Sequence, residues 1–156
     1  MSEVVKEKIL INEDYVKEYS PIPQNFNIDE VMPFAKTAEL IHIRPIIGST
    51  LYEYLLDVVN GDDEINEVDS TLLLNIYQAE AVAVYYEALP FIHIHTSEIG
   101  LTKGHSENSE STDLKDVNFI LNQLKSHLTA RLDFLKEFLD SHSDVYPLYE
   151  NNISCC

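Results

Sequence analysis

A leucine-rich seam near the C-terminal end of the chain constrains the fold more than any other feature. Its apolar residues recur at alternating spacings of three and four, which places them along one face of a helix. They are Val117, Leu121, Leu124, Leu128, Leu132, Leu135 and Leu139. The seam predicts a helix that is capped by Asp113, ends near Asp140 or His142, and packs along a second helix as in a bundle or coiled coil. At the rise of an α-helix it would be roughly 45 Å long, which is more than a small globular body needs.

A Pro–Gly pair in the first third of the chain predicts a joint between two further helices. Pro45 biases Arg44 away from the helical region, so we expect the preceding helix to stop there. Gly48 can adopt the positive φ of a tight re-entry, and Ser49 or Thr50 can cap the helix that follows. The joint sets the angle between two helices and carries no chemistry of its own.

The most apolar segment of the chain predicts a central helix. Asp69 or Ser70 can cap its start and Pro90 closes it. Residues 81–86 are apolar nearly all round, which is typical of a helix that is covered on most sides.

The N-terminal part predicts shorter elements. The apolar run Ile9–Ile11 is expected to form an edge strand or an arm laid on a neighbour. Asn12 can cap a short helix, and Asn27 or Asp29 can open another that runs to about Ile43.

These elements together predict an all-α fold: a helical bundle of about four main helices that forms one domain over residues 1–156. The core is expected over about 9–142. The β-prone run Phe91–Ile94 and the polar stretch 95–112 predict a projecting loop or short β-hairpin, and residues 143–156 an extended C-terminal arm.

The charge of the chain limits its partners. It has 27 acidic residues against 10 basic ones, a formal net charge of −17 at pH 7. Because each phosphate contact requires a Lys or Arg, we expect no gripping of nucleic acid, although DNA could pass without sticking. No stretch approaches the ~18 apolar residues of a membrane helix, so no membrane partner is expected.

The histidines raise a metal-site hypothesis that the sequence does not favour. Zinc sites usually have closely spaced ligands, and this spacing is absent from His93, His95 and His105. Surface histidines are therefore the simpler interpretation. No convergent polar constellation or nucleophile motif is present. We therefore expect no catalytic residue, no cofactor, no metal and no enzymatic activity.

Three segments resemble the head–tail connector proteins of tailed bacteriophages, and in particular the neck ring proteins of crAss-like phages that infect Bacteroides. They are Tyr15-Val16-Lys17-Glu18-Tyr19-Ser20-Pro21-Ile22, the joint Ile41-x-x-Arg44-Pro45-Ile46-Ile47-Gly48-x-x-Leu51-Tyr52-x-x-Leu55, and Val145-Tyr146-Pro147-Leu148-Tyr149. The resemblance covers about residues 9–150.

The resemblance implies a virion protein of the neck, assembled in the cytoplasm of a bacterial host. Copies would form a ring of expected dodecameric symmetry that joins the portal protein to adjacent neck or tail rings, and DNA would pass through the channel without specific binding. The segment 143–152 becomes the portal-clasp candidate, with Tyr146, Pro147, Leu148 and Tyr149 as contact residues. The stretch 95–111 becomes a contact with a neighbouring subunit or ring, with Ile99, Leu101 and Lys103.

Two alternatives stay open on the sequence alone. Arg44 either pairs with an acid at a subunit boundary or forms an intramolecular salt bridge that caps the first long helix. The chain as a whole is either a ring subunit or an acidic regulator that mimics DNA and occupies the basic groove of a nucleic-acid enzyme.

Overall fold

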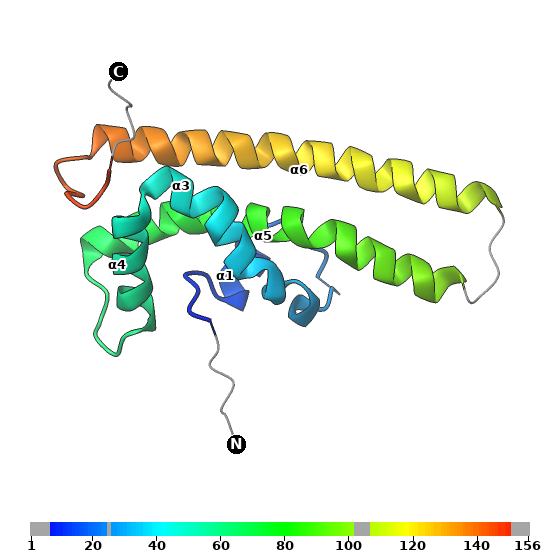
Figure 1. Ribbon diagram of the computed structural model, residues 1–156, viewed down its shortest axis with the longest axis horizontal. Coiled ribbons are helices and arrows are strands. Elements are labelled where there is room, and N and C mark those ends of the chain that lie inside the picture. The colour runs from blue at the N-terminus through cyan, green and yellow to red at the C-terminus, as the bar shows by residue number, and fades with distance from the viewer. Residues whose placement is uncertain (1–6, 25, 102–106, 151–156) are drawn as a thin grey trace.

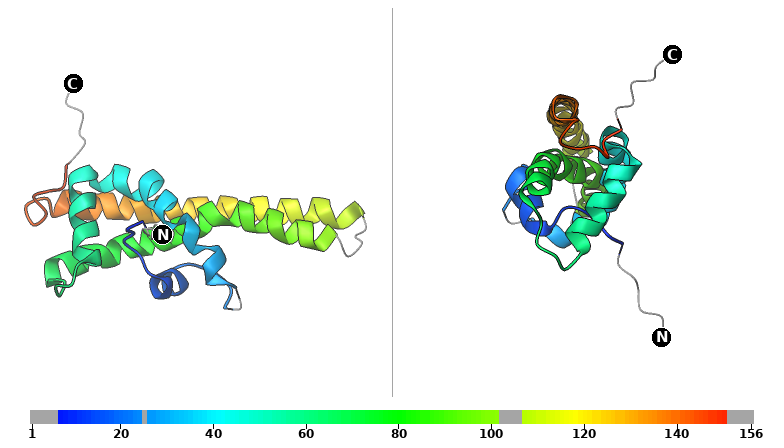
Figure 2. Two further views of the ribbon diagram at one scale, coloured as in Figure 1. Left: turned by 60° about the horizontal axis from the view of Figure 1, so that its bottom comes forward. Right: turned by 90° about the vertical axis from the view of Figure 1, so that its left-hand side faces the viewer.

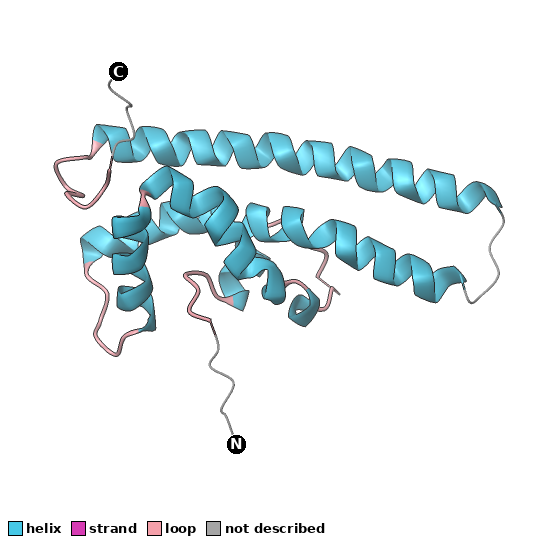
Figure 3. Ribbon diagram, viewed as in Figure 1, coloured by secondary structure: helices cyan, strands magenta, loops and turns pink. Residues whose placement is uncertain are grey.

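The computed structural model describes residues 7–24, 26–101 and 107–150, and the side chains of residues 7–24, 26–92 and 115–150. Helices and connecting loops make up the described chain, which contains no strand (Figure 3). The predicted all-α fold is confirmed. In chain order the elements are α1 (Glu13–Tyr19), η1 (Ile28–Glu30), η2 (Met32–Phe34), α2 (Ala35–Ala38), η3 (Glu39–Ile43), α3 (Arg44–Ile47), α4 (Ser49–Asn60), α5 (Glu67–Leu101) and α6 (Glu107–Ser141).

The two longest helices, α5 and α6, form an antiparallel pair that spans the molecule (Figure 1). The seam of α6 faces α5: Leu124, Leu128, Leu135 and Leu139 are buried. The predicted bundle seam is therefore confirmed. Each helix has 35 residues, about 52 Å at the rise of an α-helix.

The shorter helices cover the N-terminal part of α5. Helices α1, α2 and η3 pack against it, and α3 also reaches α6. Seen along the long axis, α5 lies between α6 on one side and α1 and α4 on the other sides (Figure 2). Residues 81–84 of α5 are consequently buried, as the apolar run predicts for a central helix.

The joint bends at Gly48, which has a φ of 89°, as predicted, but not at Arg44. Arg44 stays in the helical region and α3 follows η3 without a gap, so the expected stop at Arg44 is wrong. The reason lies in η3, a π-helical turn in which the N–H of Arg44 donates to the carbonyl of Glu39. A widened turn relaxes the demand for the backbone hydrogen bond that Pro45 cannot donate. Ile47 is buried and Ile46 is half-buried against the core.

Two predicted caps are replaced by their neighbours. Neither Ser49 nor Thr50 caps α4, because Gly48 occupies the N-cap position and no side chain bonds there. The side chain of Asn66, and not Asp69 or Ser70, caps α5 by accepting the N–H of Asp69 at 2.8 Å. The predicted cap of α1 by Asn12, which accepts the N–H of Tyr15 at 3.0 Å, is confirmed.

The expected loop or hairpin over 95–112 is wrong for the part of it that the structure describes. Helix α5 continues through Pro90 to Leu101 and α6 already begins at Glu107, so the run Phe91–Ile94 is helical too. Because α5 packs along α6, tertiary contacts offset the single hydrogen bond that Pro90 removes. Residues 102–106 lie outside the described chain.

The two ends of the described chain fold back on the body, which corrects both expected extensions. The N-terminal arm, residues 7–11, forms no strand, and its Leu10 and Ile11 are buried in the core of the same chain. The segment 143–150 turns under α6, where Tyr146 and Tyr149 are buried. Residues 151–156, the rest of the expected C-terminal arm, lie outside the described chain.

Candidate functional site

The portal-clasp candidates divide into two pairs with opposite orientations. The hydroxyl of Tyr146 donates to the carbonyl of Val68 at 2.9 Å, and that of Tyr149 donates to Oδ1 of Asp140 at 2.6 Å. Both rings therefore anchor the segment to its own body, and the expectation that these aromatic side chains are free for a partner is wrong. Pro147 and Leu148, by contrast, are exposed.

The anchor of Tyr149 perturbs both of its groups. Burial, followed by the hydrogen bond to Asp140, raises the pKa of Tyr149 to about 12. The same hydrogen bond, followed by the one from Lys136, lowers the pKa of Asp140. The pair thus holds the segment through a charged acceptor.

The inter-subunit candidates are not brought together in the described structure. Arg44 is exposed and forms no ion pair with a described residue, so the intramolecular salt bridge is absent there. The side chains of Ile99, Leu101 and Lys103 lie outside the described part. The same holds for the three histidines of the metal hypothesis, His93, His95 and His105, and the described residues contain no cluster of metal-ligating groups.

A buried polar cluster, which the sequence analysis missed, lies beneath the N-terminal arm. Glu39 is fully buried, and it accepts the N–H of Leu10 on Oε2 and the hydroxyl of Tyr52 on Oε1, both at 2.7 Å. The ammonium group of Lys36 donates to the Tyr52 hydroxyl and to the carbonyl of Lys8, both at 3.0 Å. The cluster fastens the arm to η3, α2 and α4.

Glu80, on α5, adds a second carboxyl group to this cluster. It is fully buried, and neither oxygen accepts a hydrogen bond from a described residue. Burial, then a hydrogen bond with Glu39 and the charge of that carboxylate, raise the pKa of Glu80, while the Ile11 N–H and Lys36 lower it less. Neither that contact with Glu39 nor the one with the Ile11 N–H reaches hydrogen-bond geometry, so burial and the neighbouring charge of Glu39 hold the pKa of Glu80 above its ordinary value.

The sequence does contain a signal for this cluster. Glu80 interrupts an apolar stretch, with Ala79 before it and Ala81-Val82-Ala83 after it. A charge inside such a run is an informative observation, because Glu is rarely buried without a partner. Glu39 follows buried Ala35 by four residues and so shares its face, but a neighbour 41 positions away in the chain leaves no local pattern that would pair it with Glu80.

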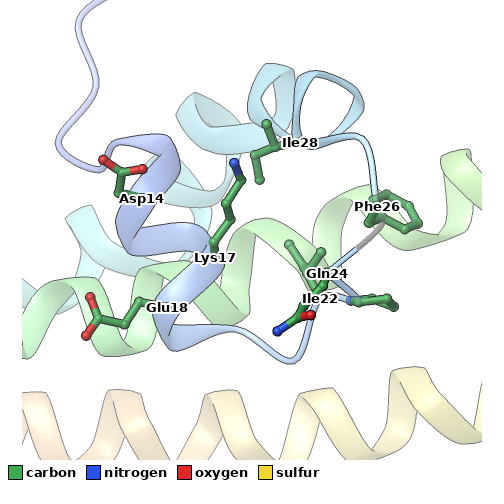
Figure 4. Close-up of a pocket in the computed structure, with 8 residues that line it drawn as sticks. Asp14, Lys17, Glu18, Ile22, Gln24, Phe26 and Ile28 are labelled. Carbon is green, nitrogen blue, oxygen red and sulfur yellow. The ribbon is translucent and has the colours of Figure 1, made fainter.

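A shallow depression of about 360 Å³ lies between α1 and the segment 20–28 (Figure 4). Lys17 extends over it towards Ile28, while Asp14 and Glu18 carry the acidic charge of the same helix. A single lysine between two exposed acids provides neither a general acid–base pair nor an activated nucleophile. The depression therefore carries no chemistry.

Exposed apolar side chains of the described residues lie outside the C-terminal segment too, and two groups of them are considered further. One is on α6, where Phe119 and Phe134 are 65% and 55% exposed. The other is a groove of about 560 Å³ between the N-terminal arm, the end of α4 and the start of α5, where Ile65 and Leu74 are 37% and 40% exposed. Exposed apolar surface of this kind is typical of protein–protein contacts.

Comparison with known proteins gives a family without an assigned activity. None of the described helices has the length and apolar character that a membrane-spanning segment needs. Neither the curated proteins nor the solved structures contain a match to the chain. A family model does match residues 43–156, which include the joint, α4, α5 and α6, and the chain belongs to that family, DUF6712, a family of unknown function.

Proposed function

We propose that this protein is a structural subunit of a bacteriophage neck, where copies form a ring that joins the portal to the tail. The proposal rests on the resemblance of the joint and of the aromatic C-terminal segment to head–tail connectors. It assigns the chain no catalytic activity and requires no cofactor. The neck of the virion is its proposed location, and a dodecamer is its proposed assembly.

The observation that carries the proposal is the part of the α5–α6 pair that extends past the shorter helices (Figure 1). A chain of this size needs no such projection to complete its own core, since the shorter helices pack on the other part of α5. Phe91 and Phe119, which are 61% and 65% exposed, lie on these two helices. The projection, together with these exposed rings, of which Phe91 stacks on Phe34 of η2, supports a role in assembly, because large exposed apolar groups mark contacts with partners.

The net charge supports the position around a genome channel. A dozen copies at −17 each would surround the channel with negative charge, which repels the phosphate backbone and lets DNA slide. Positive charge is scarce on the shorter helices, where exposed Arg44 has no acidic partner among the described residues and remains our candidate for a subunit boundary.

The structure of the C-terminal segment divides the four candidate portal-contact residues into two roles. Tyr146 and Tyr149 hold the segment against α5 and α6, which leaves Pro147 and Leu148 on its outer side. An anchored segment loses little conformational entropy on binding, so a preformed contact of this kind favours affinity. We assign the direct portal contact to Pro147 and Leu148 and a supporting role to the two tyrosines.

The experiment that tests this function is co-expression of the full chain with the portal protein from its own genome, followed by cryo-electron microscopy. The proposal predicts a closed ring of this chain stacked coaxially on the portal. A Leu148→Asp variant should lose the portal but keep its own ring, while Leu40→Asp, at a comparably exposed position on η3, should retain both. A chain that ignores the portal and instead captures a basic nucleic-acid enzyme would contradict the proposal and favour the DNA-mimic alternative.

A further inference from the structure

The outward side of α6 carries a second stripe with helical spacing. From Ile120 onward its residues follow one another at intervals of three and four, Phe119 precedes Ile120 directly, and all six are exposed: Phe119, Ile120, Gln123, His127, Ala130 and Phe134. None is an acid or a lysine, and the whole stretch 117–132 contains no Asp or Glu although the chain has 27 of them. We refer to these six residues as the α6 outer face. A second apolar stripe on a helix that already has a core seam is expected where the helix touches two partners.

The groove beside the N-terminal arm has the opposite character. Its lining is mainly apolar and includes Ile9, Tyr15, Val59, Ile65, Leu73 and Leu74. Its surroundings are acidic, since Glu13 lies in its wall and the turn between α4 and α5 contributes Asp62, Asp63 and Glu64. We refer to it as the arm groove.

The two surfaces lie on opposite sides of the molecule, so one chain cannot bring them together. Helix α6 runs along one side of α5, whereas the N-terminal arm and the turn between α4 and α5 lie on the other (Figures 1 and 2). Their charges are complementary over most of the face: the stretch 117–132 carries Lys125 and Arg131 and no carboxylate, Asp133 beside Phe134 is the first acid after it, and the groove is bordered by carboxylates. Two copies with a charge of −17 each repel at most relative orientations, and this pairing is one that avoids acid against acid.

We propose that the α6 outer face of one copy docks into the arm groove of the next copy, with Phe119 or Phe134 inserted between Ile65 and Leu74. The occupant of the groove is thus a second copy of this chain. The contact joins two different surfaces, and repetition of such a head-to-tail contact closes into a ring when the rotation between copies allows it. The inference rests on the proposed ring function and names the surfaces that build the ring.

A mixing experiment with two complementary variants tests this contact. The face variant, Phe119→Ser/Phe134→Ser, removes the aromatic rings, and the groove variant, Ile65→Asp, places a charge in the apolar groove at a position outside any helix. Every substituted side chain is at least one-third exposed, so the fold should be retained, and circular dichroism checks this. Each variant alone should weaken assembly about tenfold or more, because aromatic anchors dominate such contacts. An equimolar mixture should then form a one-to-one heterodimer, since one intact face still meets one intact groove.

The control is Leu40→Asp. It changes a leucine that is 45% exposed and lies outside both surfaces, so this variant should assemble as the wild type does. Native mass spectrometry distinguishes the outcomes. If the wild type assembles and both variants do as well, the docking surfaces are wrong while the ring function stands. If only the face variant fails and the mixture gives no heterodimer, the α6 outer faces pair with each other and the groove is not used. If the wild type itself stays monomeric at every concentration, the ring function is overturned together with this inference.

Discussion

The hydroxyl of Tyr52 donates a 2.7 Å hydrogen bond to Oε1 of Glu39 inside the core, while the N–H of Leu10 occupies the other oxygen of the same carboxylate. Each oxygen of Glu39 therefore accepts one hydrogen bond, and the adjacent buried Glu80 has a pKa raised well above its ordinary value. The cluster couples the N-terminal arm to the π-helical turn and to the central helix. Because the arm lines one wall of the arm groove, the state of these buried groups bears on the shape of an assembly surface.

The first prediction concerns the proton of Glu80. Glu80→Gln keeps the size and shape of the buried side chain and removes its ionisable group next to the Glu39 carboxylate, so it should raise the free energy of unfolding at pH 7 by about 1–3 kcal/mol. The pKa of Glu80 is raised in the folded state, so above the ordinary carboxyl pKa the unfolded chain loses this proton first. The wild type should accordingly lose stability as the pH rises from about 5, by at most about 1.4 kcal/mol per pH unit for this group, and the variant should not. Urea unfolding of both proteins between pH 5 and 8 measures the difference. Parallel pH profiles of the two proteins would contradict the raised pKa of Glu80.

The second prediction concerns the Tyr52 hydroxyl. Tyr52→Phe leaves one oxygen of the buried Glu39 without its donor, so we expect a loss of about 1–3 kcal/mol in the free energy of unfolding. The matched control is Tyr54→Phe, whose hydroxyl bonds Asp69 at 2.7 Å at a more exposed position and should cost less. Hydrogen exchange should also show faster exchange of the Leu10 amide in Tyr52→Phe only. Equal effects of the two substitutions would contradict the role of the buried cluster in holding the N-terminal arm.

The third prediction concerns the bend of the joint. Gly48 has a φ of 89°, where an L side chain is strained, and a Cβ there would stand 3.4 Å from Cβ of Glu150. Gly48→Ala should therefore destabilise the fold by about 1–2 kcal/mol. Ser49→Ala should be nearly neutral, because the Ser49 side chain caps no helix. Thermal unfolding of both variants checks the pair, and a costly Ser49→Ala would restore the cap that the sequence predicted.

The fourth prediction concerns the anchor of the C-terminal segment. Tyr149→Phe removes the largest cause of the lowered pKa of Asp140, so that pKa should return towards its ordinary value. Lys136→Met removes the smaller cause and should shift it less. In the wild type the lowered pKa contributes stability above the ordinary aspartate pKa, and this contribution is lost as the pH falls through the folded-state value. NMR titration of the carboxyl chemical shifts measures the pKa of Asp140 in all three proteins. An unchanged pKa in Tyr149→Phe would contradict the hydrogen bond that holds the segment on α6.

Periodicity was enough to predict the helical fold and its central pair, and local rules were not enough to predict the boundaries. The seam from Val117 to Leu139 and the bend at Gly48 follow from spacing and backbone chemistry alone. Pro45 and Pro90 were expected to end helices, because a lost hydrogen bond is costly when nothing offsets it. The π-helical turn before Pro45 and the packing of α5 along α6 supply the compensation, and neither is visible in a window of a few residues.

For the candidate surfaces too, local spacing carries part of the information and contacts between distant residues carry the rest. The spacing on α6 between Ile120 and Phe134 contains the outer face, but the stronger leucine seam dominates the same stretch and a single apolar stripe already accounts for a packed helix. The burial of Tyr146 and Tyr149 depends on contacts with residues of α5 and α6, as far as 78 positions away for Tyr146. Long-range hydrogen bonds of this kind leave no local pattern, so an aromatic tail and an aromatic anchor look alike in sequence.

The most direct test of the central claim is the mass of the assembled chain in solution. Native mass spectrometry of the full chain across a range of concentrations should give one closed species that contains a fixed number of copies, with twelve as the expected number. A protein that stays monomeric throughout, or that forms open chains of increasing length without closure, would contradict its assignment as a ring subunit.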